Sequence, residues 1–368
     1  MNRSRVTTRG LEDARPGREA PPGAKRPVRL PGDGQRDRAR GARGARGGWG
    51  GQGGRRGKRA AEEEFRSYYG LPVLKKPVWE AREIAGYLFL GGLAGASSLL
   101  ALGAQLTGRP GLARGAKAGA AAAAALSLAA LVADLGRPAR FLNMMRVFKP
   151  TSPMSVGTWI LTGYAPAAMA SAACDITGLL PAVGLAGTVA AAALGPALAS
   201  YTGVLLGDTA IPAWHDAHRE LPFLFVFSGA TAAAGLGLAC AADGETAPAA
   251  RLALIGGGGE LAAETLLERG LEPVVRRAYH EGKAGALLRT AKVLVVAGGL
   301  GAAVSARSRP LRLAASAALL AASACTRFGV FYAGVASAED PAATIEPQRA
   351  RMARREAECG ADQSNATR

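Results

Sequence analysis

Long apolar runs recur along the chain from residue 84 onward, and they constrain the fold more than any other feature. The first run, residues 84–106, contains no charged side chain. A helix needs about 20 mostly apolar residues to cross a bilayer, and such runs are too long for the core of a small soluble domain. Further runs are found at residues 115–133, 156–174, 183–206, 221–242, 248–267, 286–306 and 312–335. The pattern predicts an all-α integral membrane protein, a bundle of eight transmembrane helices rich in the small residues that permit close packing.

Both ends of the chain differ in composition from these runs. The first 60 residues carry seventeen Lys and Arg against five Asp and Glu, and they are rich in Gly and Pro. Too few apolar side chains are present to offset the entropy of ordering, so we predict a disordered basic tail over residues 1–65. Anionic membrane lipid is one candidate partner for this tail, and we expect no specific nucleic acid. Residues 343–368 form a polar C-terminal tail.

An even number of spans places both chain ends on one side of the membrane, which we name the terminal face. The expected loops on this face carry slightly more Lys and Arg than the opposite loops, and the basic tail adds to this excess. The positive-inside rule therefore favours a cytoplasmic terminal face. We predict a multi-pass protein of the cell membrane with both termini in the cytoplasm.

Polar side chains gather at the terminal-face ends of the expected helices. Glu83 and Tyr87 lie in the first turns of the first helix, Asp134 ends the second, and Tyr201 lies late in the fourth. Each ionisable group in a membrane is energetically expensive and is therefore a candidate for function or for a specific pair. The clustering predicts a polar pocket that opens on the terminal face, although Tyr201 could equally be an aromatic residue of the membrane interface.

Four further charges lie deeper in the expected bundle. They are Glu260, Glu264, Lys292 and Arg327. Charges at this depth predict pairing inside the bundle. The sequence leaves open whether such pairs only stabilise the bundle or also form a proton path.

Cysteine and histidine placement bears on metal and cofactor sites. The four cysteines form no CxxC motif, so we expect no iron–sulfur cluster held by this chain. No histidines face one another within the expected helices, so we expect no haem. His215 and His218 could bind a metal on one helical turn, but a lone pair is weak evidence, and we predict no metal site.

A one-sided polar pocket without a redox centre limits the choice of ligand. A transporter usually shows polar or broken helices near the bilayer midplane and often repeated halves, and no clear repeat is present. An amphipathic ligand dissolved in the membrane fits better, because its head can lie at one interface while its tail lies in lipid. A quinone is such a ligand.

Five segments between residues 66 and 342 resemble the NrfD/PsrC family, the membrane subunits of polysulfide-reductase-type complexes. The most specific is the run of residues 134–161 with DLGRP, RFLNM and SPMS. The others are YYGLPVLKKPVW (68–79), YLFLGGLAGASSLLA (87–101), YTGVLLGDTAIPAW (201–214) and RFGVFYAG (327–334). The resemblance thus covers an NrfD-like eight-helix domain and excludes both tails.

The resemblance implies a haem-free subunit that exchanges electrons between a quinone, expected to be menaquinone, and an iron–sulfur partner. That partner is expected to be a four-cluster ferredoxin-like subunit attached to a molybdopterin catalytic subunit. Family members hold the quinone head with polar residues at the start of the first helix, the Asp ending the second helix and a Tyr late in the fourth. The matching positions here are Asp134 and Tyr201, with Glu83 and Tyr87 as candidates on the first helix. An Asn/His pair used by some relatives is not evident.

The loop after Asp134 completes the expected site. Asp134 can hydrogen-bond a quinone oxygen or relay a proton, and Arg137 or Arg140 can hold it ionised. A basic, partly aromatic surface for a protein partner is expected further along the loop. Its residues are Arg140, Phe141, Arg146 and Lys149. The simpler alternative is that these cations only signal membrane topology.

These observations predict a quinone-interacting membrane anchor, a non-autonomous subunit of a quinone-linked molybdopterin oxidoreductase of anaerobic respiration. One alternative is a purely structural anchor without quinone turnover. The other is a proton- or solute-translocating membrane protein that uses the deeper charges.

Overall fold

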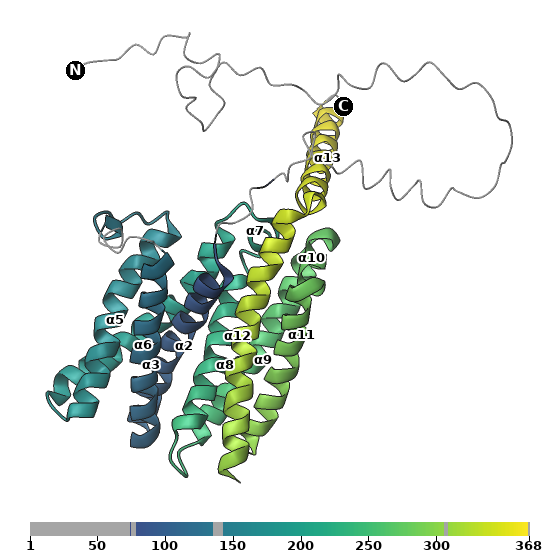
Figure 1. Ribbon diagram of the computed structural model, residues 1–368. Helices are drawn as coiled ribbons and strands as arrows, with labels where there is room; N and C mark the ends of the chain where they lie inside the picture. Colours follow the sequence, from purple (N-terminus) through teal and green to yellow (C-terminus); the bar gives the residue numbers. More distant parts are fainter. Residues whose placement is uncertain (1–73, 75–78, 135–142, 305–307, 367–368) are drawn as a thin grey trace, which may run out of the picture. The chain divides into compact units, whose positions relative to one another are not determined.

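The computed structural model describes residues 74, 79–134, 143–304 and 308–366, and helices make up nearly all of this part of the chain. Eight of its helices run side by side (Figure 1). They are α2 (Ala81–Leu106), α3 (Pro110–Asp134), α5 (Pro153–Thr177), α6 (Pro181–Gly207), α8 (Leu221–Cys240), α9 (Ala247–Gly270), α11 (Gly282–Ala303) and α12 (Arg309–Glu339). The predicted basic tail, residues 1–65, lies outside the described residues.

Six helices of the described chain are long and apolar enough to cross a membrane: α2, α3, α6, α8, α11 and α12. The other two helices of the bundle have similar lengths but differ in composition. In α9 the apolar run is interrupted by several charges, among them Glu260 and Glu264. In α5 the Gly, Ser, Thr and Pro residues lower the mean hydropathy of the helix. The all-helical membrane class expected from the sequence is confirmed, whereas the count of eight spans stays a prediction.

The outer surface of the bundle carries large apolar side chains. Exposed examples occur on helices throughout the bundle, including Leu126, Val189, Phe223, Val293 and Leu300. A soluble protein rarely leaves so many large apolar residues exposed, whereas lipid is a favourable solvent for them. The bundle is therefore suited to a lipid environment.

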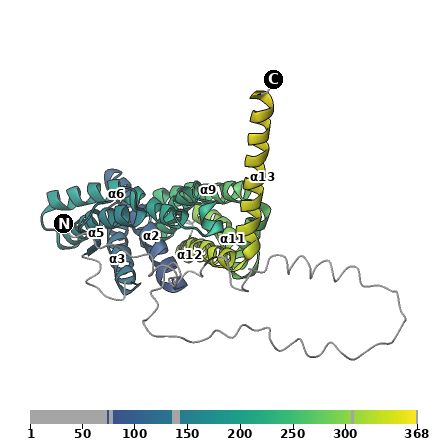
Figure 2. The same ribbon diagram turned by 90° about the horizontal axis from the view of Figure 1, so that it is seen from above.

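Small residues set the spacing of the central helices. Helix α2 packs against α3, α6, α8 and α12. A Cβ atom on Gly95 would overlap the backbone of Gly195 on α6, and one on Gly229 of α8 would press on the backbone of Gly92. Glycine at these crossings allows the backbones to touch, as in many membrane bundles. Helix α2 is thus fixed between the α3–α5–α6 group and the α8–α9–α11–α12 group, which occupy the two sides of the view from above (Figure 2).

Local sequence signals set several helix boundaries. Helices α3, α5 and α6 begin on Pro110, Pro153 and Pro181, where the missing N–H costs nothing and the fixed φ suits a helix. The side chain of Ser152 caps the start of α5, and Gly178 ends that helix with a φ of 71°. These signals create short turns, so that successive helices are antiparallel.

The short helices α7 (Pro212–His215) and α10 (Pro273–His280) lie at the end of the bundle where α2 begins and α13 follows α12 (Figure 1). Trp214 of α7 is fully buried here, donates from Nε1 to the carbonyl of Val330 at 2.8 Å, and stacks on Trp79. The Tyr279 hydroxyl of α10 donates to the carbonyl of Ala213 at 2.7 Å. These contacts join α7, α10, α12 and the segment before α2 at the terminal face of the bundle.

Helix α13 (Pro341–Ala366) continues beyond α12 and projects away from the bundle in both views (Figures 1 and 2). It covers nearly all of the segment that the sequence assigns to a polar tail. Ala343 and Pro347 in its first turns are buried, and Arg351 lies 3.7 Å from Asp216 in an ion pair. The first half of α13 therefore has contacts that fasten it to the terminal face.

Candidate functional site

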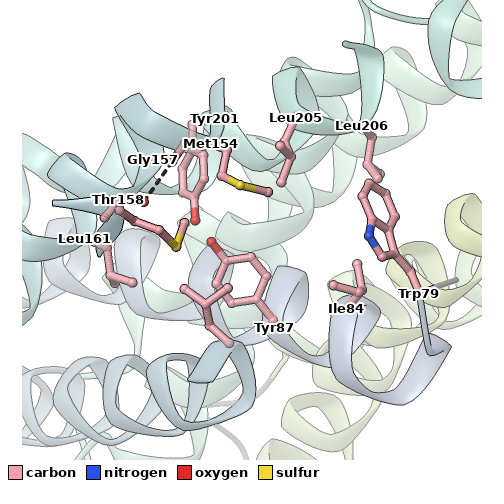
Figure 3. Close-up of a pocket in the computed structure, with 12 residues that line it drawn as sticks. Trp79, Ile84, Tyr87, Met154, Gly157, Thr158, Leu161, Tyr201, Leu205 and Leu206 are labelled. Carbon is pink, nitrogen blue, oxygen red and sulfur yellow. Dashed lines mark hydrogen bonds between the residues drawn. The ribbon is translucent and has the colours of Figure 1, made fainter. Parts of the chain in front are cut away.

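A cleft of about 650 Å³, a volume that includes space open to its surroundings, lies between α2, α3, α5 and α6 near the terminal face (Figure 3). Its walls are mostly apolar and include Ile84, Leu131, Leu161, Leu205 and Leu206. Membrane-soluble ligands favour concave, apolar sites with a few well-placed polar groups. The polar groups of this cleft therefore decide what it can bind.

Two tyrosines supply those polar groups. Tyr87 on α2 and Tyr201 on α6 are 5% and 7% exposed, and their hydroxyls point toward one another across the cleft (Figure 3). Within the described part of the chain, neither hydroxyl has a hydrogen-bond partner. A buried hydroxyl normally has one, so both are placed to donate to a ligand that enters between them.

Helix α5 shapes the wall beside Tyr201. Met154, Gly157, Thr158 and Leu161 all line the cleft, and their spacing places them on one helical face. A Cβ atom on Gly157 would overlap the ring of Tyr201, so glycine provides the space that this ring occupies. The Thr158 hydroxyl donates to the carbonyl of Met154 at 2.8 Å and is thereby satisfied within its own helix.

The other residues expected around the quinone are only partly described. Asp134 is the last residue of α3, one turn beyond Leu131 of the cleft wall, but its side chain is not among the described ones. Arg137 lies outside the described residues. Glu83 is half-buried one turn before Tyr87 and does not line the cleft. The structure thus brings Tyr87 and Tyr201 together and places the end of α3 next to them.

The expected partner-binding loop is likewise described in part. Arg140 and Phe141 lie outside the described residues. Arg146 and Lys149 are exposed, and the Lys149 backbone N–H donates to Ser155 Oγ at 3.0 Å, which ties the loop to the start of α5. Two cations of the expected surface are therefore accessible beside the cleft.

A separate group of buried charges lies among α8, α9 and α12. Arg327 is fully buried; its Nη2 donates to the carbonyl of Phe225, and its guanidinium carbon lies 3.8 Å from the centre of the Phe225 ring. Glu260 accepts from the Thr326 hydroxyl at 2.6 Å. No ion pair joins Glu260 to Arg327 among the described side chains. Within the described part of the chain, Glu260 Oε2 and Arg327 Nε and Nη1 have no hydrogen-bond partner, which is rare for buried polar atoms.

A row of charges leads from Glu260 to the terminal face. Glu260, Glu264 and Glu268 follow one another at four-residue intervals on α9 and so share one helical face. Lys292 of α11 lies 3.4 Å from Glu264 and 2.9 Å from Glu268, and His280 of α10 lies 3.7 Å from Glu268. We name these five residues the acidic row. The carboxylate, ammonium and imidazole groups from Glu264 to His280 lie close enough to exchange protons, and the buried Glu260 lies one helical turn from Glu264.

Several residues of both sites are absent from the sequence-based predictions. Trp79 lies just before α2 and Met144 lies in a short helical segment before α5; both line the cleft, and only tertiary packing brings them there. Glu268 and His280 extend the row of predicted charges to the surface. The four-residue spacing of the glutamates is a sequence signal that could have identified Glu268.

The fold and the cleft define a class of protein: a multi-pass helical membrane protein with a mostly apolar cleft near one face. The family model described as "Polysulphide reductase, NrfD" matches residues 73–255, which include every residue that lines the cleft. Over this region the chain belongs to the NrfD family, as the sequence motifs predict. A comparison with curated proteins finds no match. The family identifies a membrane subunit of polysulphide-reductase-type oxidoreductases, whose members pair with molybdopterin oxidoreductase subunits.

Proposed function

We propose that this protein is the quinone-interacting membrane subunit of a multi-subunit oxidoreductase, exchanging electrons and protons between the quinone pool and an iron–sulfur partner. The observation that carries the proposal is the pair of buried tyrosine hydroxyls, Tyr87 and Tyr201, which face one another in a mostly apolar cleft. A quinone head is an apolar ring with two carbonyl acceptors, and a bound quinone supplies two-electron, two-proton redox chemistry.

The described residues fit such a head group. Tyr87 and Tyr201 donate hydrogen bonds to its oxygens, while Leu161 and Leu206 exclude water from its ring. Asp134 terminates α3 beside the cleft and exchanges protons with the terminal face. Arg137 follows Asp134 in the chain and favours its ionised form.

The remaining features of the complex follow from this arrangement. We propose eight membrane spans, with α5 and α9 held in the membrane by the helices around them, and a terminal face in the cytoplasm. A four-cluster ferredoxin-like subunit binds the terminal face at Arg140, Phe141, Arg146 and Lys149 and joins a molybdopterin catalytic subunit to this chain. Menaquinone is the proposed quinone.

The test separates quinone turnover from a purely structural anchor. Asp134→Asn and Tyr201→Phe are introduced into the assembled complex, and quinone-linked electron transfer is measured beside subunit stoichiometry. Quinone turnover predicts intact assembly with reduced electron transfer, most strongly in Asp134→Asn because proton exchange is lost. Full activity in both variants with intact assembly would show that the chain only anchors its partners.

The acidic row supports a second function, proton translocation. Glu260 is a buried carboxylate, one helical turn from Glu264, and Glu264 and Glu268 are paired with Lys292 toward the terminal face. In sealed vesicles that hold the complex, Glu260→Gln is expected to abolish proton uptake coupled to electron transfer. The matched control is Glu281→Gln, which removes an exposed carboxylate from the same face. Equal proton uptake in wild type and Glu260→Gln would rule out this role.

A further inference from the structure

A second cavity of charged character lies at the opposite end of the bundle from the cleft. It occupies about 510 Å³, including space open to its surroundings, where α2 ends, α3 begins and α5 ends. Three cations, Arg109, Arg114 and Lys117, line it together with a single carboxylate, Asp175. Because these helix ends lie at the edge of the apolar bundle, the cavity lies at the depth of lipid head groups.

The charges in this cavity are incompletely balanced. Lys117 donates to Asp175 Oδ1 at 2.9 Å, and Arg114 Nε donates to Asp175 Oδ2 at 3.2 Å. The side chain of Lys117 is only 7% exposed, although it lies seven residues into α3, about 10 Å along the helix from Pro110. One carboxylate thus serves two cations, and among the described residues the Arg109 side chain donates only to the carbonyl of Thr107, at 3.5 Å. The cavity retains a net charge of about +2 and free guanidinium donors.

The N-terminus of α3 does not contribute to the attraction of this cavity for an anion. Its first free N–H groups, those of Gly111 and Leu112, donate to the carboxylate of Glu245 at 3.3 Å and 2.6 Å. The helix dipole is therefore already satisfied from within the protein. The remaining attraction for an anion comes from the arginine side chains.

Exposed apolar side chains flank the cavity. Leu106 follows the cavity residue Gln105, and Ile176 follows Asp175; they are 74% and 68% exposed. Leu179, at the turn after α5, is 67% exposed. A ligand that binds here therefore meets cationic donors inside the cavity and an apolar surface next to it.

We propose that this cavity binds the phosphate group of an anionic phospholipid, whose acyl chains lie on the apolar side chains around Leu106 and Ile176. Guanidinium groups suit a phosphodiester because their planar fork donates two parallel hydrogen bonds. Basic pockets between membrane helices are recognised sites for anionic lipid head groups. The lipid neutralises the excess charge of Arg109 and Arg114 and joins the α2–α3 turn to the end of α5. This site is separate from the quinone cleft and does not depend on the function proposed for it.

The test measures lipid retention by the full-length protein. Protein purified in mild detergent is titrated with phosphatidylglycerol, phosphatidylcholine or inorganic phosphate, and bound copies are counted by native mass spectrometry. The variant is the double substitution Arg109→Gln and Arg114→Gln. The matched control is Arg251→Gln, which removes an exposed arginine at the same end of the bundle but outside the cavity.

The wild type and Arg251→Gln are expected to retain one tight copy of phosphatidylglycerol. The double variant is expected to bind it at least about tenfold more weakly, since hydrogen bonds to charged groups are lost. A second double variant, Arg109→Lys with Arg114→Lys, keeps the charge and is expected to regain part of the affinity. Equal retention of phosphatidylglycerol by wild type and the Gln variant, or equal binding of phosphatidylcholine, would overturn the proposal. Inorganic phosphate that binds as tightly as the lipid would overturn it too.

Discussion

Replacing Tyr201 by phenylalanine removes one hydroxyl from the cleft and leaves the ring in place. The consequence for the empty protein is small, because this hydroxyl has no partner among the described residues and the substitution breaks no hydrogen bond there. The consequence for a bound quinone is the loss of one neutral hydrogen bond, about 0.5–1.5 kcal/mol. The dissociation constant is therefore expected to rise about 2- to 12-fold.

Tyr87→Phe is expected to have an effect of the same size, and the double variant reports on geometry. If each hydroxyl binds a different quinone oxygen, the two losses add in free energy, giving roughly 5- to 150-fold weaker binding. If both hydroxyls bind the same oxygen, the double variant loses less than this sum.

The matched control is Tyr164→Phe, because Tyr164 is equally buried but already bonded. Its hydroxyl donates to the carbonyl of Ala94 at 2.6 Å and lies 2.7 Å from Ser98 Oγ. Losing it leaves buried groups unpaired and should lower stability by about 1–3 kcal/mol while quinone affinity is unchanged. Replacing Tyr87 or Tyr201 by phenylalanine should instead lower quinone affinity and leave stability nearly unchanged.

Binding can be followed in nanodiscs by quenching of tryptophan fluorescence with a short-chain quinone analogue. Trp79 lines the cleft and should carry the response, which Trp79→Phe should abolish. Thermal melting of the same samples measures stability. If Tyr201→Phe melts as low as Tyr164→Phe and binds the analogue like the wild type, the cleft is not a quinone site.

Three further substitutions test packing around the sites. Gly157→Ala places a methyl group against the Tyr201 ring. It is expected to lower the free energy of unfolding by about 1–3 kcal/mol and to reduce quinone-linked activity. A Gly157→Ala protein that melts and works like the wild type would contradict this steric argument. Gly195→Ala brings a methyl group against the backbone of α2 and should lower the melting temperature without acting on the cleft. Burial, the largest cause, and nearby carboxylates raise the pKa of Tyr279 above its usual value of 10.0, so the folded protein holds this proton more tightly than the unfolded chain. That contribution is complete below pH 10 and is lost as the pH rises further; melting curves up to pH 11 should show a larger loss in wild type than in Tyr279→Phe.

Much of the fold could be predicted because the membrane imposes a simple rule. A stretch of about 20 apolar residues must satisfy its backbone internally, and a helix does so without reference to the rest of the chain. Each of the expected runs therefore overlaps a long helix. The exception in detail is the polar C-terminal segment, where helix α13 forms over Pro341–Ala366 although no apolar run indicates it.

The site was harder to predict from the sequence, because it depends on contacts between distant segments of the chain. Tyr87 and Tyr201 were both candidates from the sequence, yet nothing in their spacing shows that their hydroxyls face one another. Trp79 enters the cleft only because it packs on Trp214, which lies far along the chain. Among the deeper charges, Lys292 forms an ion pair with Glu264, in line with the pairing expected from the sequence. Arg327 instead packs on the Phe225 ring and donates to the Phe225 carbonyl.

Helix α2 lies in contact with both the cleft and the buried Arg327. Tyr87 lies on the cleft, and Gly92, five residues and about 7.5 Å further along the axis, lies against the guanidinium of Arg327. Five residues turn an α-helix by roughly 140°, so the two contacts lie on nearly opposite faces. A shift of α2 that moved Tyr87 would also move the backbone of Gly92 beside Arg327, and the glycine contact of α2 with α6 leaves little space for such a shift. A quinone proposed to bind beside Tyr87 would therefore be expected to act on the packing of Arg327 through this single tightly packed helix.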